Sequence, residues 1–339
     1  MATTATATVR SQLPERAKHP AFSLGALRFI ALRFGRMILV FVATTLLVFS
    51  LSSLVPGDPA LTLAGEDADP ATVALIREEL GLDRPWLVQY LSWFGGLFVG
   101  DLGQSFAFRA PVGDLILDRF PATASIALSA IAIAILMGGL VGMWAAATRG
   151  RLADRITTVL STLGIVTPNF WVGMILILLF SFALPIFPAV GYTPLGDGFG
   201  EWLAHITLPA IALAMSVGAE LQRQTRSSVS DVLTQDYIRT ARAQGLSRGR
   251  VLWTRALKNG SLPVVTVIGY QMAGLLGGSV VVEKVFNIPG LGTLAINSVV
   301  AKDLPVLQGI VLVSTVIVLF VNFLTDVLYT VLNPKVRVS

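Results

Sequence analysis

The sequence predicts an all-α integral membrane protein with six transmembrane helices. Of its 339 residues, 54% are hydrophobic and only 13% are charged, whereas a soluble globular domain carries roughly 25% charged residues. The apolar residues come in runs close to the ~20 that an α-helix needs to cross ~30 Å of hydrocarbon. The expected spans are about 37–55, 122–147, 158–184, 206–222, 263–282 and 306–332.

Residues 1–35 predict a cytoplasmic N-terminal tail, because scattered basic residues precede a full-length span and no signal-peptide pattern occurs. Within it, residues 22–34 place arginines among aromatic and aliphatic residues. They predict either an amphipathic helix at the membrane surface or a flexible basic tail. The membrane domain is expected to cover 36–333, and the short basic segment 334–339 is expected to be cytoplasmic too.

The charges of the loops indicate which side of the membrane each one faces, since cytoplasmic loops are enriched in Lys and Arg. The first span ends in Pro56-Gly-Asp-Pro59, and the segment 57–120 is expected outside, because ten acidic and four basic residues lie between Asp58 and Arg119. The loop 223–262 is expected inside: eight basic and three acidic residues lie from Glu220 to Lys258. This pattern requires the weak fourth span to cross, and it places both termini inside.

Two of the spans carry features beyond hydrophobicity. Gly138, Gly139 and Gly142 in the second span predict close packing on a neighbouring helix, because small residues let helices approach. In the third span, Thr167-Pro168-Asn169 predicts a bent or interrupted helix. Such a break can mark a transport pathway or can be a packing kink.

Several functional classes are excluded or disfavoured. The chain has no Gly-x-x-x-x-Gly-Lys phosphate loop and no Gly-x-Ser-x-Gly or His-Glu-x-x-His motif, so no catalytic set is expected. Its net charge of +5 follows from the basic inner loops and does not predict nucleic-acid binding. The last span carries Asn322 and Asp326, which lie four residues apart on one helix face. They are candidates for a buried functional pair, but helix packing is the favoured interpretation.

The most distinctive loop is Gln235 to Gly245. Tyr237 to Gln244 is a good helix sequence with small residues, and Gly245 is a natural helix C-cap. Ser247 can cap a second helix, expected to end before Leu262-Pro263. Small residues flanked by arginines suit a rod that lies in another protein's groove.

The residues Arg239-Thr-Ala-Arg-Ala-Gln-Gly245, followed by Leu262-Pro263, resemble the EAA loop of ABC importer permeases of the dipeptide/oligopeptide/nickel branch. The resemblance covers almost the whole chain after the tail. Its further motifs, in order, are Pro56-Gly-Asp-Pro59, Glu79-Leu-Gly-Leu-Asp-Arg-Pro85, Gly100-Asp-Leu-Gly103, Phe120-Pro-Ala-Thr123, Val264 to Gly269 and Val285 to Gly292. The chain departs from the general pattern at Arg239, where other branches have glutamate, so no contact of that glutamate is carried over.

The resemblance implies a transport subunit and no enzyme, in the cytoplasmic membrane of a bacterium or archaeon. A second permease would complete the path through the lipid membrane, an extracytoplasmic solute-binding protein would deliver peptides, and two partner subunits would bind ATP and Mg²⁺. This chain would hold no cofactor. The coupling helix would contact the ATPases, with these residues: Arg239, Thr240, Ala241, Arg242 and Gly245.

The substrate and the transport path stay open at the level of sequence. Nickel complexes, glutathione-like solutes and oligosaccharides are alternative substrates, and a secondary transporter or channel is the alternative class. The candidate path-lining residues, which could equally pack between helices, are Thr167, Asn169, Thr266, Gln271 and Ser279.

Overall fold

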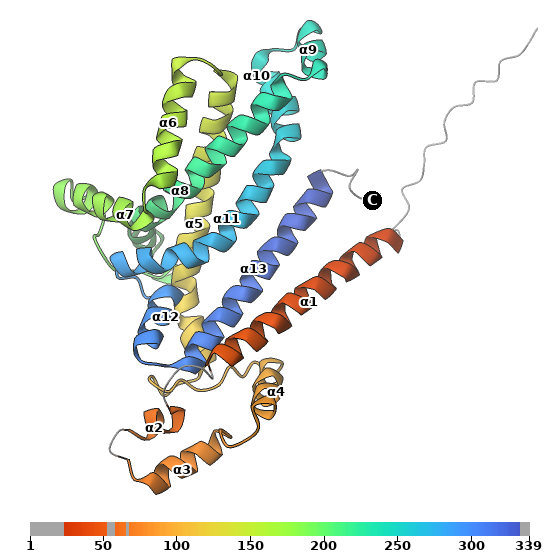
Figure 1. Cartoon of the computed structure of the whole chain (residues 1–339). Coiled ribbons are helices and arrows are strands. Elements are labelled where there is room, and N and C mark those ends of the chain that lie inside the picture. Colours follow the sequence, from red (N-terminus) through yellow and green to blue (C-terminus); the bar gives the residue numbers. More distant parts are fainter. Residues whose placement is uncertain (1–23, 53–57, 66–67, 333–339) are drawn as a thin grey trace, which may run out of the picture.

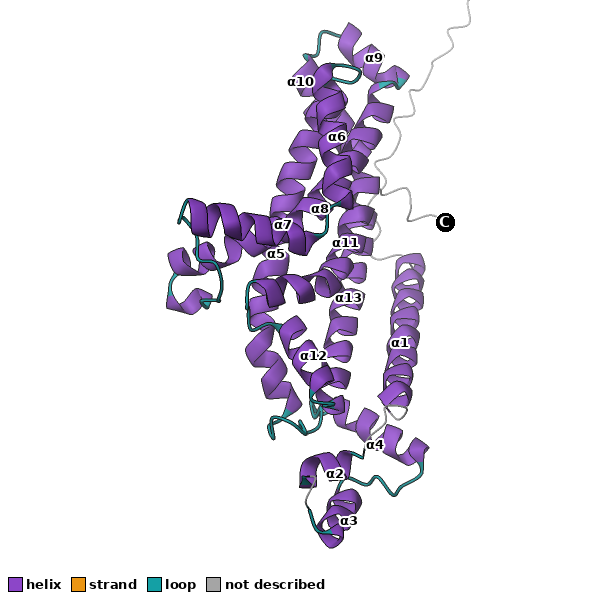
Figure 2. Ribbon diagram, turned by 60° about the vertical axis from the view of Figure 1, so that its left-hand side comes forward, coloured by secondary structure: helices purple, strands orange, loops and turns teal. Residues whose placement is uncertain are grey.

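The computed structural model describes residues 24–52, 58–65 and 68–332, and these residues form helices and loops without a β-strand (Figure 2). The N-terminal elements are α1 (Leu24–Ser52), α2 (Pro59–Ala64), α3 (Pro70–Glu79) and α4 (Trp86–Leu97). The central ones are α5 (Val112–Ala147), α6 (Leu152–Val166), α7 (Asn169–Ile177) with a π-helical extension (Leu178–Ala183), a 3-10 turn (Leu195–Asp197) and α8 (Phe199–Leu233). The C-terminal ones are α9 (Asp236–Ala243), α10 (Arg248–Val251), a π-helical turn (Leu252–Ala256), α11 (Leu257–Val285), α12 (Leu291–Val300) and α13 (Leu304–Leu332).

Five of these helical segments are long and apolar enough to cross a membrane. They are Leu32–Leu51, Val112–Ala147, Phe199–Leu233, Arg248–Val285 and Leu304–Tyr329. A sixth candidate is the pair α6 and α7, which meet at an angle of 101°. The predicted break at Thr167-Pro168 is therefore confirmed. The expected helix 158–184 is divided there, because Pro168 lacks the N–H that would continue the helix.

Helix boundaries differ from the expectations in three places. Residues 24–35, assigned to the tail, continue directly into the first span as part of α1. α5 begins at Val112 and includes Pro121, so the last residues of the expected outer segment 57–120 belong to this helix. The expected fourth span 206–222 lies inside a 35-residue helix, whose polar second half extends beyond the apolar run.

The prediction that a helix ends before Leu262-Pro263 is wrong. Pro263 lies inside α11, and the helical chain from Arg248 to Val285 is continuous. The residues that follow the proline, including Val264, Val267 and Ile268, pack against the main core. This burial favours continuing the helix although proline removes one of its backbone hydrogen bonds. The sequence analysis also did not predict α12, which lies between the expected spans 263–282 and 306–332.

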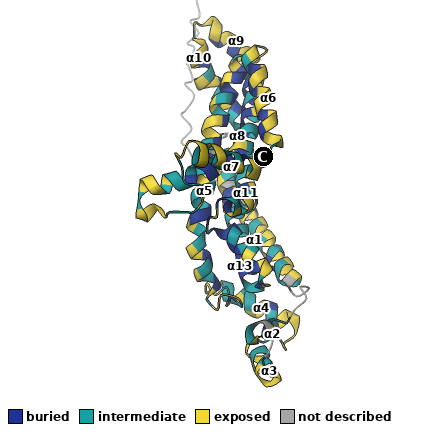
Figure 3. Cartoon of the chain, turned by 90° about the vertical axis from the view of Figure 1, so that its left-hand side faces the viewer, coloured by how far each residue is buried: buried dark blue, intermediate teal, exposed yellow. Residues whose placement is uncertain are grey.

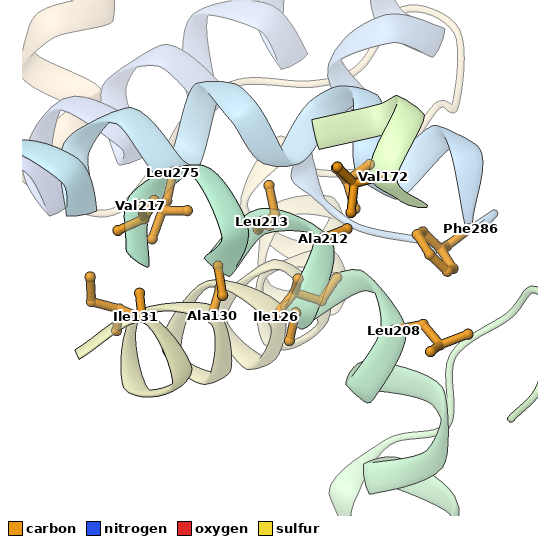
Figure 4. Packing of buried hydrophobic residues seen from close by; sticks show 14 of the residues in the cluster. Ile126, Ala130, Ile131, Val172, Leu208, Ala212, Leu213, Val217, Leu275 and Phe286 are labelled. Carbon is orange, nitrogen blue, oxygen red and sulfur yellow. The ribbon is translucent and has the colours of Figure 1, made fainter. Parts of the chain in front are cut away.

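The main core forms where α5, α8 and α11 cross (Figure 4). It includes Ile126 and Ala130 of α5, Leu213 of α8 and Leu275 of α11. The two longest helices approach closely: a methyl group on Gly138 would lie 2.6 Å from the Gly218 carbonyl oxygen. The predicted role of the small residues in the second span is thereby confirmed for this position.

The two ends of the molecule are built differently. In Figure 1, α9 and α10 lie at one end, and α2, α3 and α4 lie at the other. α1 and α13 run side by side along one flank (Figures 1 and 2). Exposed residues follow the outer sides of α1 and α6 (Figure 3), as expected of helices that meet lipid or partner subunits.

Candidate functional site

The loop that resembles a coupling element forms a short helix with a defined end. α9 stops at Gly245, whose φ of +86° lies in the left-handed region. The N–H of Leu246 donates to the Ala241 carbonyl (3.3 Å) and that of Gly245 to the Arg242 carbonyl (3.0 Å), the two bonds of a Schellman motif. The predicted helix and its glycine stop are confirmed.

α9 is seated on a small apolar cluster of its own. Ile238, Ala241 and Val251 are buried there, with Leu246 packed against them. Ala241, one of the five proposed coupling residues, therefore faces the inside of the chain. Its small side chain lets α9 lie close to α10, and its expected contact with an ATPase stays an untested prediction.

The other four proposed coupling residues are exposed: Arg239, Thr240, Arg242 and Gly245. The Arg239 guanidinium lies 3.3 Å from the Asp236 carboxylate on the same helix. The exposed side of α9 is thus a basic surface, and its opposite side packs on the apolar cluster described above.

Further contacts fix this loop to the next helix. The Ser247 hydroxyl accepts the N–H of Arg250 (3.4 Å), which confirms Ser247 as the cap of α10. Asn259 Nδ2 donates to the hydroxyl of Tyr237 (3.0 Å). α9 therefore cannot move independently of the start of α11 without breaking this bond.

The two loops expected inside lie at the same end of the molecule. Asp154, at the start of α6, pairs with Arg226 in the second half of α8, and its carboxylate also accepts the N–H of Gly150 (2.9 Å). This ion pair joins the basic loop 149–155 to the helix that leads into α9.

The proposed path-lining residues occupy different environments. Thr167 and Asn169 are partly buried at the break between α6 and α7, and a methyl on Gly278 of α11 would lie 3.9 Å from Asn169 Nδ2. Thr266 is exposed and Gln271 partly buried, both on α11. The break thus faces α11.

The fifth of them, Ser279, is fully buried. Its hydroxyl donates to the Leu276 carbonyl (3.0 Å). Ser279 therefore packs inside this chain, and its side chain is not exposed to line a transport path.

A buried carboxylate that the sequence analysis missed lies next to Ser279. Glu283 is fully buried and accepts hydrogen bonds from the Thr123 hydroxyl (2.7 Å) and the Thr293 N–H (3.0 Å). Glu283 thereby caps the first turn of α12 from a different helix.

The glycines of the Pro-Gly-Leu-Gly motif are explained by this carboxylate. A methyl on Gly290 would lie 2.4 Å from Glu283 Oε2, and one on Gly292 would lie 2.8 Å from the same atom. Only glycine lets the turn reach the carboxylate. The available signal in the sequence was an acid close to this motif at the end of a long uncharged span.

The pair Asn322 and Asp326 separates in the structure. Asp326 forms an ion pair with Arg33 of α1, whereas the side chain of Asn322 is exposed. Because Arg33 and Asp326 join α1 to α13, the packing interpretation of Asp326 has a direct structural basis.

Comparison with protein families gives two adjoining matches. The profile described as binding-protein-dependent transport system inner membrane component matches residues 138–338. The profile of the N-terminal part of such membrane components matches residues 26–127. Together they cover nearly all of the residues that the structure describes.

Individual relatives match at similar length. A Brucella abortus (strain 2308) protein named as a peptide transport system permease is 44% identical over 305 residues, 90% of this chain and 97% of the relative. The glutathione transport system permease protein GsiC of Salmonella choleraesuis is 40% identical over 311 residues, 92% and 99% of the two chains.

The fold also resembles a solved structure. A chain of the MetNI methionine ABC transporter in an inward-facing conformation superposes with a TM-score of 0.54, at 14% identity, covering 65% of this chain and 96% of that chain. At this identity the similarity concerns the fold alone.

Proposed function

Since the chain belongs to the family of binding-protein-dependent transport system inner membrane components, and is thus a permease subunit of an ABC importer, we propose that it imports peptides. It does so together with a second, similar permease, two ATP-binding subunits and an extracytoplasmic solute-binding protein. ATP and Mg²⁺ are bound by the partner subunits. The relative named for peptide transport, at 44% identity, supports this substrate class.

The proposed mechanism depends on one observation: α9 exposes a basic surface while its other side packs on a buried apolar cluster. Arg239, Thr240 and Arg242 are exposed, while Ile238 beneath them is fully buried. An exposed helix that is held rigidly can transmit the movement of a partner to the membrane helices. α9 is accordingly the coupling helix, and Gly245 sets where it ends.

The proposed topology has six crossings, namely α1, α5, the broken pair α6 and α7, α8, the segment from α10 to α11, and α13. Both termini and the loop 223–262 lie in the cytoplasm, and most of the segment 57–120 lies outside. The ion pair between Arg33, in the first half of α1, and Asp326, near the end of α13, supports this arrangement. It brings the two terminal helices together near the ends of the chain. The membrane is the cytoplasmic membrane of a bacterium or archaeon.

The transport path is proposed to run along the break between α6 and α7 and the facing side of α11. Thr167, Asn169, Thr266 and Gln271 offer polar groups there. Ser279 and Glu283 support this side from inside the chain, because both are fully buried.

The experiment is reconstitution of the complete transporter with its binding protein, followed by a survey of the solutes that stimulate ATP hydrolysis. Dipeptides and oligopeptides are expected to stimulate it. Stimulation by glutathione but not by other peptides would support glutathione as the substrate. This second candidate is suggested by the relative at 40% identity, which is named for glutathione transport. Transport by the purified chain without ATPase subunits would contradict the coupling mechanism.

A further inference from the structure

The extracytoplasmic segment contains one helix that is unlike the rest of it. α4 and the residues after it, 86–100, include no charged side chain, although Asp83 and Arg84 precede them and Asp101 follows. Three tryptophan and tyrosine residues lie in this stretch: Trp86, Tyr90 and Trp93. A helix this apolar, without one charged side chain, is not expected to lie fully in water.

One side of α4 packs on the end of α1. The ring of Phe49 in α1 lies 5.8 Å from Trp86, 5.6 Å from Tyr90 and 5.4 Å from Trp93, measured between centroids. The hydroxyls of Thr45 and Tyr90 are 3.1 Å apart and buried. α4 is therefore fixed against a helix that is itself long and apolar enough to span the membrane.

The other side of α4 is apolar and uncovered. Leu87 is 58% exposed, Leu91 56% and Phe98 78%. These residues recur at positions i, i+4 and i+11, so they form one stripe along the helix. α3, in the same segment, differs because it exposes the charged Glu78 and Glu79 beside its exposed leucine.

The contact with α1 indicates how deep α4 lies relative to the end of the apolar segment of α1. The apolar segment of α1 ends at Leu51, and Thr45 lies six residues earlier, roughly 9 Å along the helix axis at 1.5 Å per residue. The side chain that meets Thr45 is Tyr90, in the middle of α4. Amphipathic and aromatic helices at the membrane surface bury their apolar side about 5–10 Å into the boundary between headgroups and acyl chains.

The length of α4 excludes a crossing. Its 12 residues extend roughly 18 Å, well short of the ~30 Å of hydrocarbon. Figures 1 and 2 show it across the end of α1, at the end of the molecule opposite α9.

We propose that α4 is an interfacial helix whose Leu87, Leu91 and Phe98 insert into the lipid leaflet at this end of the molecule, anchoring the segment 58–120 to the membrane. Lipid is favoured over a protein partner because the exposed apolar surface continues on the end of α1, where Leu47 is 60% and Leu51 53% exposed. Tryptophan and tyrosine are moreover the residues enriched at the boundary between membrane and water.

The chain has no cysteine, so single cysteines can be labelled in an otherwise unchanged protein. Leu91→Cys is the test position, and Leu75→Cys on α3, an exposed leucine of the same segment (68%), is the matched control. Each carries an NBD fluorophore in the complete transporter, reconstituted in phosphatidylcholine and phosphatidylglycerol vesicles. Some of the lipids carry a nitroxide, either on the headgroup or near the top of the acyl chain.

The acyl-chain nitroxide is expected to quench the Leu91 probe several-fold more strongly than the Leu75 probe. Aqueous iodide should show the opposite order. Equal quenching of both probes by lipid would overturn the proposal. So would a Leu91 probe that is shielded from both lipid and iodide, since this result would identify a protein partner as the occupant.

Leu87→Cys on the same stripe gives an independent reading if the Leu91 variant does not assemble. It is expected to be quenched like Leu91, and quenching like Leu75 would count against the proposal.

Discussion

The Thr123 hydroxyl of α5 donates a 2.7 Å hydrogen bond to the buried carboxylate of Glu283 at the end of α11. The same hydroxyl accepts the N–H of Leu291 (2.8 Å), in the first turn of α12. One side chain thus satisfies a buried acid and a helix terminus at once. This junction joins α5 to the consecutive helices α11 and α12, which lie more than 100 residues later in the sequence.

Replacing Thr123 by valine is expected to destabilise this junction. The change keeps the shape of the side chain but removes the hydroxyl, which leaves Glu283 and the Leu291 N–H each short of one partner. Each unsatisfied buried group costs about 1–3 kcal/mol. The melting temperature of the purified protein should fall for Thr123→Val and stay nearly unchanged for Thr123→Ser. Equal stability of the two variants would contradict the assigned bonds.

The packing of α5 on α8 predicts different effects for two adjacent glycines. A methyl on Gly138 would lie 2.8 Å from Leu221 Cβ, whereas one on Gly139 meets no atom within 4 Å. Gly138→Ala is expected to cost about 1–3 kcal/mol, as overpacking does. Gly139→Ala should be neutral or slightly stabilising, because alanine is the better helix former. Thermal unfolding of both variants in detergent measures the difference.

The end of α9 predicts an effect on coupling that is separate from folding. Gly245→Leu places a side chain at a φ of +86°, which costs roughly 1–2 kcal/mol of backbone strain and re-aims the helix end. The variant should remain in the membrane with its partners, while solute transported per ATP hydrolysed falls several-fold.

The matched control for this experiment is Gly249→Leu. Gly249 has equally open surroundings, with no atom within 4 Å of an added methyl, but no positive φ. It should couple normally. Normal uptake by the Gly245 variant would mean that the glycine stop has no part in coupling.

The basic surface of α9 is expected to hold the ATPase subunits. Replacing both Arg239 and Arg242 by alanine should leave the melting temperature unchanged, because both side chains are exposed. Co-purification of the ATPase subunits should drop several-fold. Relative to the unchanged protein, the loss for the double variant should exceed that for Arg84→Ala, at the opposite end. It should be largest at low salt and become smaller as salt is added, since exposed charge contacts are screened.

The sequence predicted the helices well where hydrophobicity and turn residues agree. The glycine stop at Gly245 and the break at Thr167-Pro168 both depend on local backbone chemistry, and both are confirmed. Pro263 misled the prediction because its local preference to end a helix is overridden by the burial of the residues that follow. That burial depends on α5 and α8, which lie far away in the sequence.

The site was harder to predict than the fold. On the single short helix α9, Ala241 is buried whereas Arg239 and Arg242 are exposed. Which side is covered becomes visible only from the packing of Val251 and Leu246 against it. Glu283 escaped notice because its partners, Thr123 and Thr293, come from different elements. A search for acids beside glycine-rich turns would have found the residue, but it would not have identified the helix that it caps.

α8 connects the core to α9 over a long distance. Pro209 lies buried within it, where the missing N–H makes the helix easier to bend. From Pro209 to Leu233 the helix extends roughly 36 Å. A tilt of about 5° at the proline would therefore displace α9 by about 3 Å. A small rotation of α8 about Pro209, among the packed side chains of the core, would thus become a displacement as large as an atomic diameter at the far end of the helix.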